Sequence, residues 1–487
     1  MPPKKISRRE LLEGVALGSV TAFLGPLGCS VSDRPKITEV KDIWALDLAE
    51  AAAKIRAREL SPVEVTQACL DRISEVDGKL NSFITVVAES ALEQARAAEA
   101  AISRGEWLGP VHGIPIALKD NIDTAGIKTT AASAVFADRV PQKDAAVVTK
   151  LKSAGAVILG KLNMHEFAGG TTSAISNYGP VRNPWNLEHI AGGSSGGNGA
   201  AVAAGLCFGS VGTDTGGSIR IPAACCGIVG LKPTYDVVDT EGLVYVSRSF
   251  DHIGPMCRTV TDTALMFQAM TDHPAAHVSD AASPRLTASL RVGLLPSKVP
   301  YCDAEVEAEV QTVVSNAIDV IRSLVAEVRD AEIPMPELGD VIGFEEYSFH
   351  ASTLESSPQL YDTRTRENIL GGKKVGKAEY DRMLRELRKH RETIDGAFSD
   401  VDLVVLPTLS TLPLKIAEAT DPFALNACTF AFSIGGLPAI SVPCGFSQSG
   451  LPIGLLIGGP RFSEPKILAL AAAYEKAAGW EKRRPSI

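Results

Sequence analysis

Alternation of helix-like and strand-like segments is the feature that most constrains the fold of this chain. The segment DAAVVTKLKSAGAVILGKLN, residues 144–163, predicts an amphipathic helix, a glycine turn and an apolar strand. Ahead of it, IPIALKDN, residues 114–121, predicts another short apolar strand that ends in charged residues. Units that alternate in this way are typical of α/β folds, in which helices are layered on a sheet.

The rest of the chain continues this pattern, with no linker that would divide it. Residues 42–73 predict two helices separated near Ser61 and Pro62, because serine is a good N-cap and proline fits the first helical position. A helix over 90–105 is expected to end at Gly105. We also expect helices within 200–204, 304–325, 379–394 and 465–480, strands within 290–297, 402–408, 439–446 and 452–460, and a surface loop over 273–284.

Charge and cysteine content exclude some function classes. The net charge of −9 gives nucleic-acid binding no electrostatic support. Beyond the N-terminal segment, no apolar run is long enough to span a bilayer. The nine cysteines match no zinc-site spacing, so no metal is expected, and most lie in apolar contexts that predict buried free thiols.

Residues 1–35 form an extension that we exclude from the fold. SRRELL, residues 7–12, precedes a short apolar segment over 15–24 and resembles a bacterial twin-arginine export signal. LGC, residues 27–29, is similar to a lipoprotein cleavage site and would place a lipid anchor at Cys29. The expectation is therefore an exported, periplasmic protein. The alternative is a cytoplasmic protein with a basic arm.

The stretch HIAGGSSGGNGAAVAAG, residues 189–205, is dense in glycine and serine. A flexible linker would stay polar, but here a small apolar run follows at once. A phosphate-binding loop of the Walker type would need a lysine after its glycines, and none is present. Both of these interpretations are therefore disfavoured, which leaves a role in a catalytic site.

A second glycine-rich segment supplies a candidate nucleophile. Ser218 follows Gly216 and Gly217, and glycines allow backbone N–H groups to converge as an oxyanion hole requires. A serine there also needs a base. The eight histidines are scattered, whereas Lys119 ends an apolar strand, where loss of water favours the neutral amine that can act as a base. Taken alone, Lys119 would be a solvated charge.

Together these segments resemble the amidase signature family. The glycine- and serine-rich signature is matched over GGSSGG, residues 192–197, and DTGGSIR, residues 214–220. The lysine segment LKDN, residues 118–121, stands at the spacing of the family. The similarity extends over about residues 47–479 and includes GKLNMHEFAGGTTS, FDHIGPMCRT and GLPAISVPCGF.

The resemblance implies a Ser-Ser-Lys triad, with Ser218 as nucleophile, Ser194 as bridging serine and Lys119 as base. In the family a cis peptide bond precedes the bridging serine, here Gly193–Ser194. The remaining implied site residues are the oxyanion-hole backbone of Thr215, Gly216, Gly217 and Ser218, the pocket residue Gly170, and the supporting residues Ser195, Asp214 and Arg220. Asp214 and Arg220 are expected to form an ion pair, Ser195 either hydrogen-bonds in the site or completes the turn, and His165 is structural.

The expected protein is thus a single large α/β domain over residues 40–485, with a mixed, twisted sheet and helices on both of its faces. It would hydrolyse a small carboxylic amide to an acid and an amine or ammonia, with no cofactor. The segments 339–392 and 426–433 are expected to set its specificity. The sequence leaves the oligomeric state open, with a homodimer as one alternative.

Three other functions remain open. The first is the glutamine-amidohydrolase subunit of a tRNA-dependent amidotransferase, whose members carry an acidic residue for glutamine where Asn426 stands here. The second is an esterase or carbamate hydrolase that uses the same acyl-enzyme chemistry. The third is an inactive binding protein, which the intact triad positions disfavour.

Overall fold

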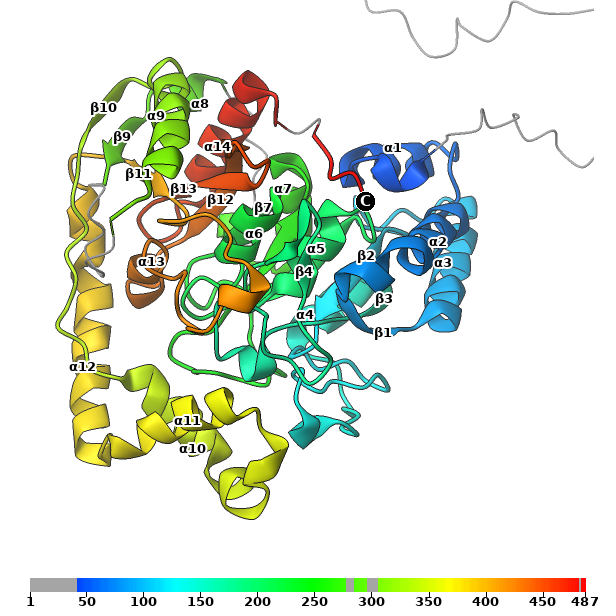
Figure 1. Ribbon diagram of the computed structural model, residues 1–487. Helices are drawn as coiled ribbons and strands as arrows, with labels where there is room; N and C mark the ends of the chain where they lie inside the picture. The colour runs from blue at the N-terminus through cyan, green and yellow to red at the C-terminus, as the bar shows by residue number, and fades with distance from the viewer. Residues whose placement is uncertain (1–41, 277–283, 296–304, 481–482) are drawn as a thin grey trace, which may run out of the picture. The chain divides into compact units, whose positions relative to one another are not determined.

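A mixed β-sheet forms the centre of the computed structural model, which describes residues 42–276, 284–295, 305–480 and 483–487 (Figure 1). Within these residues the sheet has eleven strands in the order β1-β3-β2-β6-β8-β7-β12-β13-β11-β9-β10. Their bounds are β1 Phe83–Val86, β2 Pro115–Lys119, β3 Val157–Leu162, β6 Gly209–Asp214, β7 Val229–Lys232, β8 His252–Cys257, β9 Arg291–Leu294, β10 Glu327–Asp330, β11 Leu403–Pro407, β12 Ala439–Phe446 and β13 Pro452–Gly458. A separate small sheet pairs β4, Arg182–Asn183, with β5, Asn186–Ile190.

Parallel and antiparallel pairing occupy different parts of the large sheet. Strands β3, β2 and β6 run parallel, as do β11, β9 and β10. The strands between these two groups, and β1 at one edge, pair antiparallel with their neighbours. The prediction of a mixed sheet in an α/β domain is confirmed.

Helices cover both faces of this sheet, as β6 shows. Successive strand residues point to opposite faces, so Gly209 and Gly212 face opposite ways. A Cβ on Gly209 would meet Met266 of α7, whereas one on Gly212 would meet Ser195 beside α5. The helices are α1 Leu48–Arg56, α2 Pro62–Leu80, α3 Ala88–Ser103, α4 Ala146–Ser153, α5 Gly196–Ala203, α6 Arg220–Cys226, α7 Val260–Met270, α8 Pro284–Ala288, α9 Ala308–Arg322, α10 Val341–Ser356, α11 Thr363–Gly371, α12 Lys377–Thr393, α13 Phe430–Ile434 and α14 Glu464–Ala478.

The helix and strand predictions agree with this architecture where the apolar pattern is strong. Segment 144–163 forms α4, a turn with Gly155 at φ +82°, and β3. Ser61 caps α2 by accepting a hydrogen bond from the backbone N–H of Val63, with Pro62 at the first helical position. The cysteines that the structure describes are free thiols, and all of these except the half-buried Cys444 are buried.

Two predicted boundaries are wrong. The buried helix expected from residue 200 begins at Gly196, because the glycines themselves are helical and closely packed. The expected surface loop starts instead with a short helical turn, Pro274–Ala276, whose two alanines are buried. Residues 277–283 of that segment, and the proposed export signal over 1–35, lie outside the described residues.

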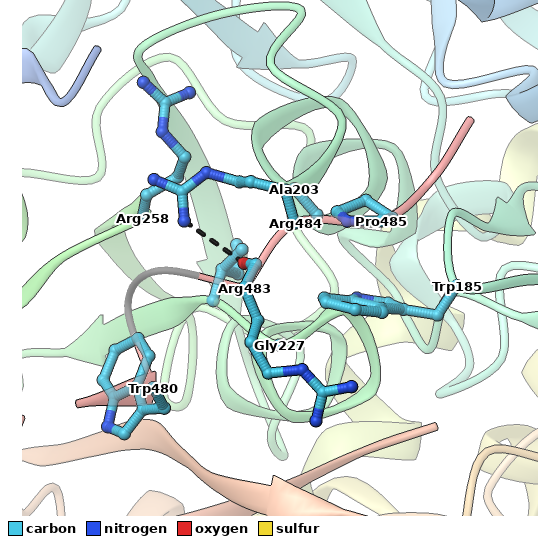
Figure 2. Close-up of a pocket in the computed structure, with 9 residues that line it drawn as sticks. Trp185, Ala203, Gly227, Arg258, Trp480, Arg483, Arg484 and Pro485 are labelled. Atoms are coloured by element: carbon cyan, nitrogen blue, oxygen red, sulfur yellow. Dashed lines mark hydrogen bonds between the residues drawn. The ribbon is translucent and has the colours of Figure 1, made fainter. Parts of the chain in front are cut away.

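No helix in the described part of the chain is both long and apolar enough to cross a membrane. The C-terminal residues pack back onto the domain, where Arg72 donates a hydrogen bond to the carbonyl of Ile487 at 3.1 Å. Figure 2 shows the crevice beside this segment, with Trp185 and Trp480 on its walls. Its volume of about 10 Å³ is enough for about one water molecule, so the crevice is too small to bind a substrate.

Candidate active site

The predicted site residues gather where two parallel strands end. Lys119 is the last residue of β2 and Asp214 the last residue of the neighbouring β6. Carboxyl ends of adjacent parallel strands meet at one edge of a sheet, which is the usual position of a site in an α/β fold. Ser194 and Ser195 directly precede α5, and Ser218 lies in the short connection between β6 and α6.

Lys119 is fully buried and hydrogen-bonded on three sides. Its Nζ atom lies 2.7 Å from Ser194 Oγ, 2.7 Å from Thr213 Oγ1 and 3.3 Å from the Thr213 carbonyl oxygen. Burial lowers the pKa of Lys119 to about 7, although the carboxylates of Asp251 and Asp214 act in the opposite direction. A large fraction of Lys119 is therefore a neutral amine near neutral pH.

Ser194 lies in a turn that packs tightly against the segment after β3. The Gly193–Ser194 peptide bond is cis, as the resemblance implies. The Ser194 carbonyl accepts hydrogen bonds from the His165 N–H at 3.0 Å and the Ser173 hydroxyl at 3.2 Å. A Cβ on Gly193 would lie 2.7 Å from the backbone nitrogen of Ser173, and one on Gly197 would lie 2.3 Å from the Asn163 carbonyl oxygen. These contacts explain why the stretch is rich in glycine.

Ser218 is nearly buried, with 5% of its surface exposed. Its carbonyl accepts a hydrogen bond from the Ser195 N–H at 3.2 Å, which joins the nucleophile segment to the Ser194 turn. Ser195 also donates its hydroxyl to the Thr213 carbonyl at 3.1 Å, so it both completes the turn and bonds within the site. Gly217 has φ +145°, and a Cβ there would meet Thr429 Oγ1 at 2.3 Å, so only glycine fits this position.

Asp214 and Arg220 form a fully buried, bidentate ion pair. The Arg220 Nε and Nη2 atoms donate to the two carboxylate oxygens at 2.9 and 2.8 Å. Arg220 also donates to the Thr429 carbonyl at 2.7 Å and to Ser433 Oγ at 2.9 Å. Burial alone would raise the pKa of Asp214, but the adjacent guanidinium lowers it well below its usual range. This network joins the nucleophile loop to α13.

Three of these residues were not predicted as site residues. Thr213 takes two contacts from the Lys119 amine, and Asn121 donates to the Thr213 hydroxyl at 3.2 Å. Asp251 accepts a hydrogen bond from Thr215 Oγ1 at 2.5 Å and from two backbone N–H groups. Burial raises the pKa of Asp251 to about 6. The motif FDHIGPMCRT includes Asp251, but the sequence alone gave it no role.

His165 has the surroundings of a structural residue. It is buried, and its Nδ1 accepts a hydrogen bond from the Ser173 N–H at 3.2 Å. Burial lowers the pKa of His165 to about 3, so the ring is neutral near neutral pH. A Cβ on Gly170 would lie 2.4 Å from this ring, so His165 also keeps that position free of a side chain.

A cavity of about 310 Å³ adjoins Ser218. Gly170, Thr215 and Gly216, all predicted as substrate-facing or oxyanion residues, line it as well. The other lining residues are Ala168, Gly169, Thr171, Val246, Asp340, Ile342, Gly343, Glu346, Asn368, Phe423, Asn426 and Phe430. Several of these belong to the two segments expected to set specificity. No group of three or more His, Cys, Asp or Glu side chains placed to hold a metal ion occurs among the described residues.

Comparison with known proteins agrees with this geometry. The family model described as Amidase matches residues 64–468. The A-type subunit of glutamyl-tRNA(Gln) amidotransferase from Moorella thermoacetica is 40% identical to the chain, over 92% of this chain and 99% of that protein.

Solved structures with the same fold include two hydrolases. The chain aligns with 6-aminohexanoate cyclic dimer hydrolase at a TM-score of 0.81 and 28% identity, over 92% of this chain and 99% of that one. Its TM-score with the peptide amidase of Stenotrophomonas maltophilia is 0.76, at 28% identity over 91% and 98% of the two chains. The family model spans most of the chain and these relatives match nearly all of it, so the chain belongs to the amidase family, the family with the amidase signature.

Proposed function

We propose that this protein hydrolyses a carboxylic amide through an acyl-enzyme on Ser218. The observation that carries the proposal is the buried contact between Lys119 and Ser194, next to a serine that lines a cavity. A neutral amine has one lone pair and two N–H groups. The carbonyl and hydroxyl of Thr213 can accept both N–H groups, which leaves the lone pair for the Ser194 proton.

The reaction follows from this arrangement. Neutral Lys119 accepts the proton of Ser194, which accepts the proton of Ser218 as Ser218 Oγ bonds to the amide carbon. The backbone N–H groups of the Thr215–Ser218 segment stabilise the negative oxygen that forms. The C–N bond then breaks, and the proton returns through Ser194 to the leaving nitrogen. Water attacks the ester by the same relay, and the acid leaves.

A second function is favoured by the names of the relatives, which describe one subunit of a glutamyl-tRNA(Gln) amidotransferase. In that role the same relay would release ammonia from glutamine, within a complex of several subunits. The cavity lining favours the first function. Glutamine carries a free carboxylate, but the described lining includes Asp340 and Glu346 and no lysine, arginine or histidine. Asn426 is also neutral, at the position where an acidic residue for glutamine was expected.

Ammonia or amine release from a substrate panel distinguishes these functions. The panel contains aliphatic amides, aryl amides, anilides, glutamine, and the esters and carbamates that match the amides. The amidase function expects amide turnover by the isolated chain, and loss of that turnover in Ser218→Ala. Turnover of glutamine alone, dependent on added partner proteins, would support the second function. Faster turnover of esters or carbamates would assign the third.

We further propose that residues 40–485 are the catalytic domain and residues 1–35 a twin-arginine-like export signal. The basis is the sequence SRRELL ahead of a short apolar segment. The relatives' names support the cytoplasmic alternative, because an amidotransferase acting on glutamyl-tRNA belongs with protein synthesis.

A further inference from the structure

Glu346 is a buried carboxyl group in the substrate cavity that the proposed mechanism does not use. Its side chain comes from α10 and is 3% exposed. One oxygen, Oε2, accepts a hydrogen bond from Asn368 Nδ2 at 3.4 Å. The other, Oε1, has no hydrogen-bond partner among the described residues. A buried oxygen of this kind usually has a partner, so its partner here is expected to come from a bound molecule.

The open oxygen faces the space next to the predicted acyl-binding segment. A Cβ placed on Gly169 would lie 3.1 Å from Glu346 Oε1, and both residues line the cavity that Ser218 adjoins. Gly170, the next residue, is the one that the family resemblance assigns to the substrate pocket. A group bound to Glu346 would therefore belong to the acyl part of the substrate.

The charge of the cavity defines the group that fits there. Asp340, at the start of α10, adds a second carboxylate to the lining, and the described lining holds no basic side chain. Asp340 is itself held by a hydrogen bond from the Gly343 N–H at 2.7 Å, so it remains beside the cavity. Two carboxyl groups without a cation attract a positive group and repel an anion.

We propose that the substrate is an amide whose acyl part carries a protonated amine, and that Glu346 Oε1 receives that ammonium. This inference rests on the proposed hydrolysis at Ser218 and names the substrate class for that site. An ammonium gives the buried carboxylate both a countercharge and the hydrogen-bond donor that Oε1 lacks. Burial raises the pKa of Glu346 to about 8, which is the expected state of this carboxyl group before a cation arrives.

Matched substrates test the proposal. In γ-aminobutyramide an ammonium replaces the terminal methyl group of pentanamide, at nearly the same size. The wild-type protein is expected to hydrolyse γ-aminobutyramide with a kcat/KM about 10- to 100-fold higher, the range for a hydrogen bond to a charged group. Glu346→Gln should reduce that ratio to about one and leave pentanamide hydrolysis nearly unchanged. Glu355→Gln, an exposed position on the same helix, should keep the wild-type ratio.

A measurement on the wild-type protein does not depend on the folding of any variant. Propylammonium should inhibit pentanamide hydrolysis competitively, and propanol of the same size should not. Pentanamide turnover without preference for the ammonium substrate, or equal inhibition by the two small molecules, would overturn the inference and leave the proposed function standing. A Glu346→Gln variant that loses both substrates equally would also overturn it. Absence of turnover of either amide would count against the proposed function itself.

Discussion

The amine of Lys119 lies 2.7 Å from the hydroxyl of Ser194, and both side chains are fully excluded from solvent. Burial makes the charged form of the lysine unfavourable, and the contact gives its neutral form a proton to accept. The burial that lowers the pKa of Lys119 and the position that makes it useful as a base thus have one origin, the end of strand β2.

Replacement of Lys119 should abolish most of the activity without unfolding the protein. Lys119→Ala removes the base, and Lys119→Arg supplies a guanidinium that stays protonated, so both should lose at least about 10³-fold in kcat. Lys128→Ala, at a half-exposed surface position, is the matched control and should retain wild-type activity. A folded Lys119→Ala protein, checked by circular dichroism, with near wild-type amide hydrolysis would return the role of base to a histidine.

The pH dependence of kcat/KM should report the Lys119 titration. Its pKa is about 7, and the neutral form is active, so the rate should fall as the pH drops below about 7 and reach a plateau above it. The profile is measured with a neutral amide such as pentanamide, so that the substrate does not titrate. A rate that rises as the pH falls would contradict the assignment.

Asp251→Asn should move this acid limb to lower pH. The Asp251 carboxylate raises the pKa of Lys119 through its negative charge, so its loss should lower that pKa further. Asp138→Asn, where the side chain is 97% exposed, is the control and should leave the profile in place. Movement of the Asp251→Asn limb to higher pH would show that this carboxylate does not act on the lysine.

Labelling should identify the nucleophile. A fluorophosphonate is expected to modify Ser218 and no other serine, because only this hydroxyl combines the oxyanion-hole backbone with the relay. Peptide mapping by mass spectrometry locates the adduct. Ser218→Ala should not be labelled, whereas Ser195→Ala, whose hydroxyl contacts Thr213, should keep the labelled position. An adduct on Ser194 would exchange the roles of the two serines.

The sequence predicts the parts of this protein that strong local patterns determine. Segment 144–163 is recognisable because an amphipathic helix, a glycine turn and an apolar strand each have a clear signature. Strand β6 lacks one, since it is built of small residues that fit between helices on both faces. Its importance comes from packing that no local pattern records.

Candidate site residues follow the same division. Lys119, Ser194 and Ser218 were found through motifs, which describe residues close together in sequence. Asp251 approaches the site because β8 pairs with β6, with His252 opposite Asp214. Glu346 lies on α10, far along the chain from Ser218, and only the cavity brings the two together. Side chains that meet through sheet pairing or helix packing leave no spacing to detect.

Replacement of both Arg8 and Arg9 by lysine tests the export signal. If these residues address a twin-arginine exporter, the variant should stay in the cytoplasm and keep its N-terminal segment. Cell fractionation and N-terminal sequencing of the wild-type and variant proteins provide the measurement. Lys4→Arg is the control and should be exported normally. Equal distribution of the double variant and the wild-type protein would favour the cytoplasmic alternative.

The buried ion pair of Asp214 and Arg220 should contribute to stability as well as to the shape of the site. Arg220→Met leaves the Asp214 carboxylate buried without its countercharge and should lower the free energy of unfolding by about 3–5 kcal/mol. Arg382→Met removes an exposed pair with Glu386 and should cost at most about 1 kcal/mol. Urea denaturation of both variants gives the comparison. If the Arg220→Met protein were as stable as the Arg382→Met protein, the pair would serve only to position the nucleophile loop, and the loss should then appear in kcat alone.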